Sequence, residues 1–166
     1  MTEPSDRKVA LVTGGGSGIG RAAALAFVGR GVAVVIADVN DAAGHQTVAL
    51  INERGGDGVF VHTDVAQARD VEELLAGTVD AFGSLQHAFN CAGIGGKLAG
   101  TADGDEADWD RTIAVNLKGV WLCLRAEIKQ MLAGGGGSIV NASSAVALRG
   151  APGLGAYSAS RGASSS

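Results

Sequence analysis

The chain has 166 residues, of which 46% are apolar, and a formal net charge of −4. A chain of this length fits one domain with a sizeable core. Its slightly acidic balance and the lack of a basic cluster argue against nucleic acid or an anionic membrane surface as a partner. No apolar run approaches the ~18 residues that span a bilayer, so we expect no membrane segment. The 27 glycines follow no period, which excludes a collagen-like repeat and indicates turns.

Apolar runs alternate along the chain with segments whose apolar residues recur at helical spacing. They predict strands at residues 8–14, 32–38, 58–64, 85–93 and 138–144, and helices at residues 21–30, 41–54, 71–82 and 108–132. Strands that alternate with helices pair in parallel through right-handed crossovers. We therefore expect an α/β fold, a doubly wound, Rossmann-type, mainly parallel sheet of five strands with helices on both faces. One domain covers residues 7–166, residues 1–6 form a flexible N-terminus, and residues 94–105 form a loop over the strand ends.

The N-terminal sequence MTEPSDRK is polar and contains no apolar signal region. The two cysteines, Cys91 and Cys123, are too few for a disulfide framework and lack the spacing of a metal site. We therefore expect core thiols in a cytoplasmic protein, and we predict no metal site.

The first predicted strand runs directly into TGGGSGIGR, residues 13–21. Glycine at Gly14, Gly18 and Gly20 lets the backbone turn sharply and approach a pyrophosphate closely. The helix that follows would direct its unpaired N–H groups at that charge. A P-loop is excluded, because Arg21-Ala22 stand where that motif requires Lys followed by Ser or Thr. A Gly-rich turn without a ligand remains the alternative.

The second predicted strand ends in Asp38, shortly after the glycines. A carboxylate at this place can accept both hydrogen bonds from an adenosine ribose, and its charge would repel a 2′-phosphate. No Lys or Arg follows closely, so the sequence favours NAD over NADP. The alternative is that Asp38 caps the next helix.

Further motifs follow in order: TDV at residues 63–65, NCAG at 90–93, VNLKG at 115–119, SIVNASS at 138–144 and YSASR at 157–161. Together with TGGGSGIG and Asp38, they make the sequence resemble a short-chain dehydrogenase/reductase with a single Rossmann domain. The resemblance implies that Asp64 and Val65 hold the adenine and that residues 90–93 line the cofactor. The cofactor-binding set implied in this way is Gly14, Ser17, Gly18, Ile19, Gly20, Asp38, Asp64, Val65, Asn90, Ala92 and Gly93.

The same resemblance implies a catalytic set of Asn116, Ser144, Tyr157 and Arg161. A tyrosine phenol, with an unperturbed pKa of ~10, becomes a useful acid or base near neutrality only beside positive charge. Tyr157 and Arg161 are four residues apart, which places them on one face of a helix. Ser144 would donate to the reacting oxygen, and the carbonyl of Asn116 would hold a water at a helix kink. Taken singly, each residue could instead pack, cap or satisfy a backbone group.

Three departures from the family pattern accompany these motifs. Arg161 stands where the family has Lys, and Cys91 stands where it usually has a second Asn. A guanidinium does not deprotonate in a protein, unlike an ammonium group. We also expect the chain to lack the family's usual C-terminal third, which completes the tyrosine's helix and supplies two strands and a substrate lid.

The resulting expectation is an NAD(H)-dependent oxidoreductase that interconverts a secondary alcohol and a ketone by hydride transfer. The alternative is a truncated, catalytically impaired relative that acts only as a nucleotide-binding or structural module. The expected partners are a small-molecule alcohol or ketone and further copies of the chain. The resemblance implies such copies, because the family commonly pairs subunits through the helix at residues 108–132 and the tyrosine's helix.

Overall fold

The computed structural model describes residues 7–163 and contains one parallel sheet of five strands in the order β3-β2-β1-β4-β5. The predicted flexible segment, residues 1–6, lies outside the described residues. The strands are β1 (Val9–Thr13), β2 (Ala33–Asp38), β3 (Gly58–His62), β4 (His87–Asn90) and β5 (Ser138–Asn141). The predicted strand count and parallel pairing are confirmed. Within the described residues, no helix is both long enough and apolar enough to cross a membrane.

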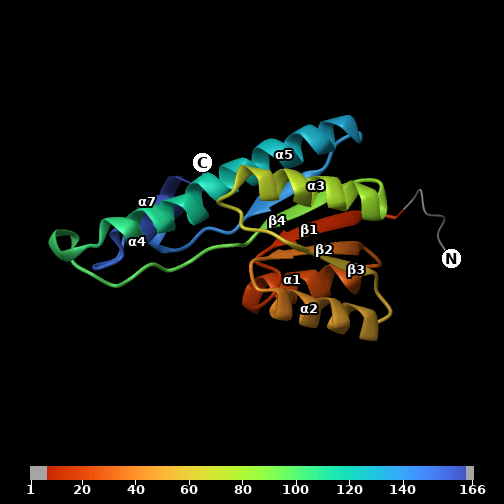
Figure 1. Cartoon of the computed structure of the whole chain (residues 1–166), viewed down its shortest axis with the longest axis horizontal. Helices are drawn as coiled ribbons and strands as arrows, with labels where there is room; N and C mark the ends of the chain where they lie inside the picture. The colour runs from red at the N-terminus through yellow and green to blue at the C-terminus, as the bar shows by residue number, and fades with distance from the viewer. Residues whose placement is uncertain (1–6, 164–166) are drawn as a thin grey trace.

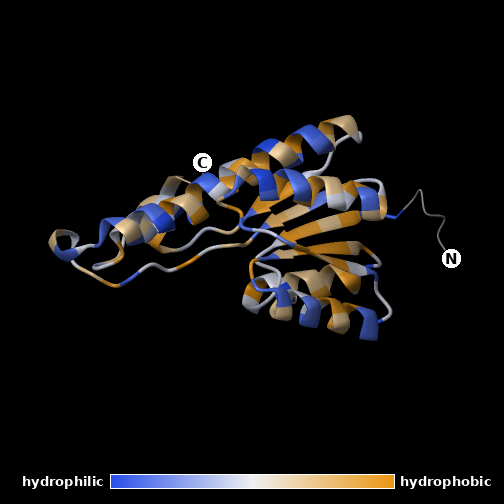
Figure 2. Cartoon of the chain, in the orientation of Figure 1, coloured by the Kyte–Doolittle hydropathy of each residue, from blue (hydrophilic) through white to orange (hydrophobic). Residues whose placement is uncertain are grey.

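Helices cover both faces of the sheet, as Figure 1 shows. One face carries α1 (Gly18–Val28) and α2 (Asp41–Glu53), and the other carries α3 (Ala68–Phe82) and α5 (Gly119–Ala133). Because helices cover both faces, the strands are apolar on both faces. Figure 2 shows the strands mostly in orange, between the two layers of helices. The Rossmann-type, doubly wound prediction is confirmed.

Alternation along β1 divides its side chains between two cores. Val9 and Leu11 pack in the larger core under α3 and α5, whereas Val12 packs in the smaller core under α1 and α2. All three are at most 1% exposed. The two cores hold the sheet rigidly, so the loops after the strands start from fixed positions.

The helix predicted at residues 108–132 forms, but it is not uniform. It consists of α4 (Glu106–Ile113), a π-helical segment η2 (Ala114–Lys118) and α5. The apolar residues at helical spacing along it do not all face the core. Val120 and Met131 are buried, whereas Trp121 and Ile128 are about half exposed on the outer face.

The segments beyond the carboxyl ends of the strands form an extension to the side of the sheet (Figure 1). It contains α4, residues 94–105 with a 3₁₀ turn η1 (Thr101–Asp103), and two short helices, α6 (Val146–Arg149) and α7 (Gly155–Ala163). The helix α7 packs against α4, η2 and α6. It carries Tyr157 and Arg161, so the predicted catalytic helix is held by tertiary contacts.

Candidate functional site

The Gly-rich loop turns sharply between β1 and α1. Gly14 and Gly18 have φ of 65° and 49°, in the left-handed region that favours glycine. A side chain on Gly20 would overlap the carbonyl oxygen of Gly14, so this glycine is needed for the helix to approach the strand. The Ser17 side chain does not cap α1, whose first turn also carries no acidic residue. The N-terminus of α1 is therefore a suitable site for a phosphate group.

A cleft of about 520 Å³ opens beside this loop along the carboxyl ends of the strands. It collects ten of the residues predicted to bind a cofactor, namely Gly14, Ser17, Gly18, Ile19, Gly20, Asp38, Asp64, Val65, Ala92 and Gly93. The remaining lining residues are Val39, Thr63, Cys91, Ile94 and Val115. Cys91 lies in the segment 90–93 that was predicted to line the cofactor, and only Val39 and Ile94 lie outside the quoted motifs. Ile19 and Val39 are 73% and 59% exposed here. Exposed apolar side chains in a cleft beside the Gly-rich loop form a suitable surface for an aromatic ring of a ligand.

Asp38 lies at the mouth of this cleft and is fixed by two backbone groups. Its Oδ2 accepts from the amide of Gly16 at 2.9 Å, and its Oδ1 accepts from the amide of Asn40 at 3.0 Å. The helix-capping alternative is wrong, because α2 is capped by Asn40, whose Oδ1 accepts from the amide of Ala43. None of the cleft-lining residues that the structure describes is Lys or Arg.

The guanidinium of Arg21 lies between the Gly-rich loop and α2, and it donates to the carbonyl of Gly16 in the loop. The Arg21 guanidinium donates to the Thr47 hydroxyl and the Gln46 amide oxygen, both at 2.9 Å. Asp38 therefore presents negative charge to the cleft without a basic residue beside it there.

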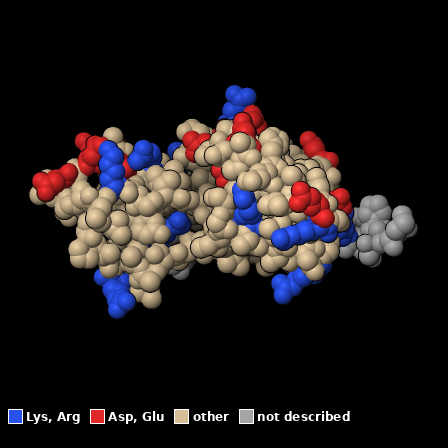
Figure 3. Space-filling model, turned by 90° about the horizontal axis from the view of Figure 1, so that it is seen from below, with Lys and Arg blue, Asp and Glu red and all other residues tan. Residues whose placement is uncertain are grey.

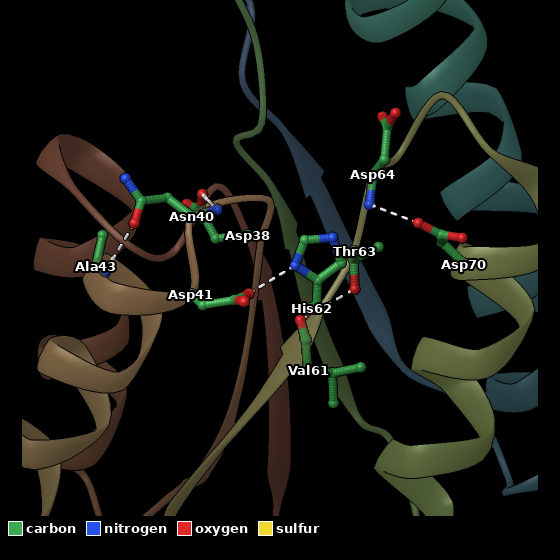
Figure 4. A network of polar contacts seen from close by, with 9 residues as sticks. All are labelled: Asp38, Asn40, Asp41, Ala43, Val61, His62, Thr63, Asp64 and Asp70. Carbon is green, nitrogen blue, oxygen red and sulfur yellow. Dashed lines mark hydrogen bonds and ion pairs between the residues drawn. The ribbon is translucent and has the colours of Figure 1, made fainter.

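The opposite rim is formed by the segment after β3 (Figure 4). The amide of Asp64 donates to Asp70 Oδ2 at 3.0 Å, and Asp64 Oδ1 accepts from the amide of Ala66 at 3.0 Å. Next to it, His62 Nδ1 lies 2.6 Å from Asp41 Oδ1, and this hydrogen bond raises the pKa of His62. These contacts fix the ends of β2 and β3 relative to one another and hold Asp64 and Val65 in the wall of the cleft.

β4 ends earlier than predicted, because its backbone leaves the ladder after Asn90. The Thr13 hydroxyl accepts from the amides of Cys91 at 3.1 Å and Ala92 at 3.2 Å. Residues 91–93 thereby turn into the cleft. The side chain of Asn90 is 1% exposed and does not line it, since its amide nitrogen donates to Glu127 and Asn141. A part for Asn90 in cofactor binding stays a prediction.

Tyr157 and Arg161 are brought together on α7. The guanidinium carbon of Arg161 lies 5.5 Å from the centre of the Tyr157 ring, and Nη1 donates to the carbonyl of Ala142 at 3.0 Å. Arg161 is only 5% exposed. Its Nη2 lies against Gly93, where any side chain would overlap it. A buried cation therefore lies beside the tyrosine and next to the cofactor-side segment of β4.

The side chain of Asn116 bridges three segments from within η2. Its Oδ1 accepts from the amide of Ile94 at 2.9 Å, and its Nδ2 donates to the carbonyl of Ile94 at 2.8 Å and to the Ser160 hydroxyl at 3.2 Å. The alternative that it satisfies buried backbone groups is therefore realised. The predicted role of its own carbonyl in holding a water stays a prediction.

Ser144 lies between β5 and α6, and its hydroxyl accepts from the amide of Val146 at 3.4 Å. Within residues 7–163, no hydrogen bond joins Ser144 to Tyr157. The predicted strand at residues 138–144 ends earlier, at Asn141, so Ser144 lies three residues beyond β5 and makes a capping contact. A catalytic part for Ser144 stays a prediction.

A second cavity, of about 310 Å³, lies between residues 97–106, the start of α4 and the start of α7. It is lined by Leu98 and Trp109 and by acidic groups that include Asp103 and Asp105. Neither Tyr157 nor Ser144 lines it, so it is distinct from the predicted catalytic residues.

Comparison with known proteins matches residues 8–166 to the short chain dehydrogenase family. The chain belongs to the short-chain dehydrogenase family. It is 42% identical over 156 residues to a short chain dehydrogenase/reductase of Aspergillus oryzae, covering 93% of this chain and 60% of that protein. A cyclohexanol dehydrogenase of Acinetobacter is 37% identical over 161 residues, covering 97% of this chain and 64% of the relative.

Among solved structures, a short-chain dehydrogenase/reductase of Burkholderia phymatum in complex with NAD superposes with a TM-score of 0.92 at 34% identity. The match covers 98% of this chain and 58% of that one. This chain therefore spans about three fifths of the length of the family members that it matches.

Proposed function

We propose that the chain is the cofactor-binding part of an NAD(H)-dependent oxidoreductase that interconverts a secondary alcohol and a ketone. The observation that carries the proposal is the cleft, which combines the Gly-rich loop, the N-terminus of α1 and a fixed Asp38. The loop geometry fits a pyrophosphate, because a side chain at Gly14 would overlap the backbone of Ala92 and one at Gly20 would overlap the carbonyl of Gly14.

The choice of NAD over NADP rests on Asp38. Its carboxylate would accept hydrogen bonds from the two ribose hydroxyls, whereas a 2′-phosphate would meet its negative charge with no cleft-lining Lys or Arg to offset it. The apolar groups of Ile19, Val39 and Val65 would contact the adenine. The names of the matched relatives are consistent with dehydrogenase chemistry.

In this proposal the nicotinamide supplies or accepts the hydride, and the chain's own residues handle the proton. The Tyr157 hydroxyl would donate a proton to the carbonyl oxygen, or remove one from the alcohol. The guanidinium of Arg161, 5.5 Å from the ring centre, would place a positive charge beside the reacting groups. Ser144 would donate to the same oxygen after leaving its capping contact, and Asn116 would anchor the loop at Ile94.

A second candidate is a nucleotide-binding module without efficient catalysis. It is favoured by the contacts of Arg161, whose guanidinium is engaged by Ala142 and packed on Gly93. Unlike a lysine, this group cannot give up a proton.

Oxidation of NADH with a panel of cyclic and acyclic ketones separates the two candidates, with Tyr157→Phe as the matched control. An oxidoreductase consumes NADH with a ketone and loses that activity in Tyr157→Phe. A binding module binds NADH and shows no turnover with either protein. If the chain does not bind NADH, both candidates are wrong.

The proposal also includes association with a second copy through the outer face of α5. Trp121, Ile128 and Leu132 lie on this face with exposures of 54%, 46% and 76%. Exposed apolar groups that recur on one helix face are typical of contact surfaces. Figure 3 shows acidic and basic side chains interspersed over the face drawn there. A cytoplasmic location stays a prediction.

A further inference from the structure

A carboxyl group is buried where α5 packs on the sheet. Glu127 is 0% exposed, although glutamate is rarely buried completely without a charged partner. Its Oε2 accepts from Asn90 Nδ2 at 2.9 Å, and its Oε1 has no hydrogen-bond partner within the described part of the chain. Burial of a carboxyl group with one hydrogen bond costs folding free energy, so packing alone does not explain its presence.

The partner of Glu127 connects two strands. The same amide nitrogen of Asn90 also donates to Asn141 Oδ1 at 3.0 Å. Asn90 and Asn141 face one another at the last paired position of β4 and β5, and Thr13 faces Asn90 on the other side. Thr13, Asn90 and Asn141 thus form a row of polar residues across the carboxyl ends of β1, β4 and β5, called the polar row below. Glu127, on α5, accepts a hydrogen bond from Asn90 at the centre of this row.

The segments that leave these strand ends form the functional site. Residues 91–93 enter the cofactor cleft directly after Asn90. The amide of Ala142, which follows Asn141, donates to the carbonyl of Asn90 at 2.8 Å, and the carbonyl of Ala142 accepts from Arg161. Gly93 and Ala142, which both contact the Arg161 guanidinium, therefore follow closely in the chain on residues of the polar row.

We propose that Glu127 is a positioning residue. It fixes the side-chain amide of Asn90 between β4 and β5, and thereby fixes the position of the cofactor-side segment 91–93 and of the backbone groups that contact Arg161. It acts through Asn90 and touches neither cofactor nor substrate. The inference about strand ends is independent of the proposed function, and only its consequence for cofactor affinity rests on that function.

The test is hydrogen exchange of the whole chain without cofactor, read by mass spectrometry in segments 88–93 and 139–142. Glu127→Leu removes the acceptor, and we expect exchange there to become about tenfold faster. The unfolding midpoint in urea should stay equal or rise, since apolar replacement of a buried charge is often neutral or stabilising. Glu127→Gln keeps an acceptor for Asn90 and should exchange like the unaltered chain. Met131→Leu, a core change one turn later on α5, is the control.

Unchanged exchange in Glu127→Leu would overturn the proposal, and so would equal acceleration in every segment or in Met131→Leu. If Glu127→Leu does not fold, Asn141→Ala on the edge strand decides, because loss of this second partner should also speed exchange in segment 88–93. NADH titration adds a separate reading, with several-fold weaker binding expected in Glu127→Leu and not in Glu127→Gln. If the unaltered chain binds no NADH while exchange behaves as expected, the proposed function fails and the role of Glu127 stands.

Discussion

The guanidinium group of Arg161 lies directly against the backbone of Gly93. A methyl group on Gly93 would overlap Nη2, and the buried guanidinium is held by its hydrogen bond to the carbonyl of Ala142. Displacement of Nη2 would disturb the hydrogen bond that Nη1 of the same group makes. The glycine of the NCAG motif and the arginine of the YSASR motif are therefore sterically coupled.

Gly93→Ala should destabilise the chain by ~1–3 kcal/mol, the usual cost of overpacking a well-filled site. In an Arg161→Lys background the cost should fall, because lysine lacks the Nη2 group that is displaced. Urea unfolding of the single and double variants gives the coupling energy. Gly95→Ala is the control, since a side chain there meets open space and its φ is not positive. Equal costs for the two alanine variants would contradict the coupling.

Asn116→Ala should leave the N–H and C=O groups of Ile94 without their side-chain partner. An unpaired buried polar group costs about 1–3 kcal/mol, and these groups are partly buried, so a loss of ~1 kcal/mol or more in unfolding free energy is expected. Limited proteolysis should also show earlier cleavage within residues 94–105. Asn52→Ala, at an exposed position of α2, should be neutral. Similar stability of both variants would show that the Asn116 bridge is weak.

The buried carboxyl group of Glu127 should make the stability of the chain depend on pH. Burial raises its pKa from 4.5 to about 7. Between these values the folded chain holds a proton that the unfolded chain has released, so the stability contributed by this group falls as pH rises through the window. The slope is ~1.4 kcal/mol per pH unit, or ~3 kcal/mol in all.

Unfolding free energies of the unaltered chain and Glu127→Gln, measured from pH 5 to pH 8, check this prediction. The difference between the two proteins should shift in favour of Glu127→Gln as pH rises. Histidines that titrate in the same range are common to both proteins and cancel. Parallel pH profiles would mean that Glu127 ionises normally.

Local pattern was sufficient for most of the fold. Uninterrupted apolar runs such as residues 32–38 predicted strands buried on both faces, and alternation with helices predicted parallel pairing. The end of β4 was predicted too late, because the Thr13 hydroxyl, far away in sequence, takes the amides of Cys91 and Ala92. Periodicity also could not predict the π-helical turn around Asn116, which depends on tertiary contacts to Ile94 and Ser160.

The sequence motifs predicted the residues of the cleft more completely than the side-chain contacts around it. Ten predicted residues line it, because the Gly-rich loop and the strand ends fix their own position. The burial of Glu127 was not predicted, because a charged residue in an amphipathic helix is normally expected on the exposed face. Asn90 was assigned to the cofactor, although its side chain faces Glu127. A strand's alternation could have suggested this orientation, because Asn90 shares a face with buried Ala88.

Association through α5 predicts that Leu132→Glu reduces the apparent mass of the chain in light scattering at micromolar concentration. A charge placed on an apolar contact face must be desolvated on association, which is unfavourable. Leu148→Glu, at an 88% exposed position on α6, is the matched control and should leave the mass unchanged. A chain that is monomeric before any substitution would refute association through this face.

Calorimetric titration with NADH and NADPH tests the cofactor cleft most directly. The unaltered chain should bind NADH more tightly, and Asp38→Asn should narrow or reverse the preference by removing the charge that faces the ribose. Asp41→Asn neutralises a nearby carboxylate that pairs with His62 outside the cleft, and it should keep the preference. Absence of NADH binding, or tighter binding of NADPH by the unaltered chain, would contradict the assignment.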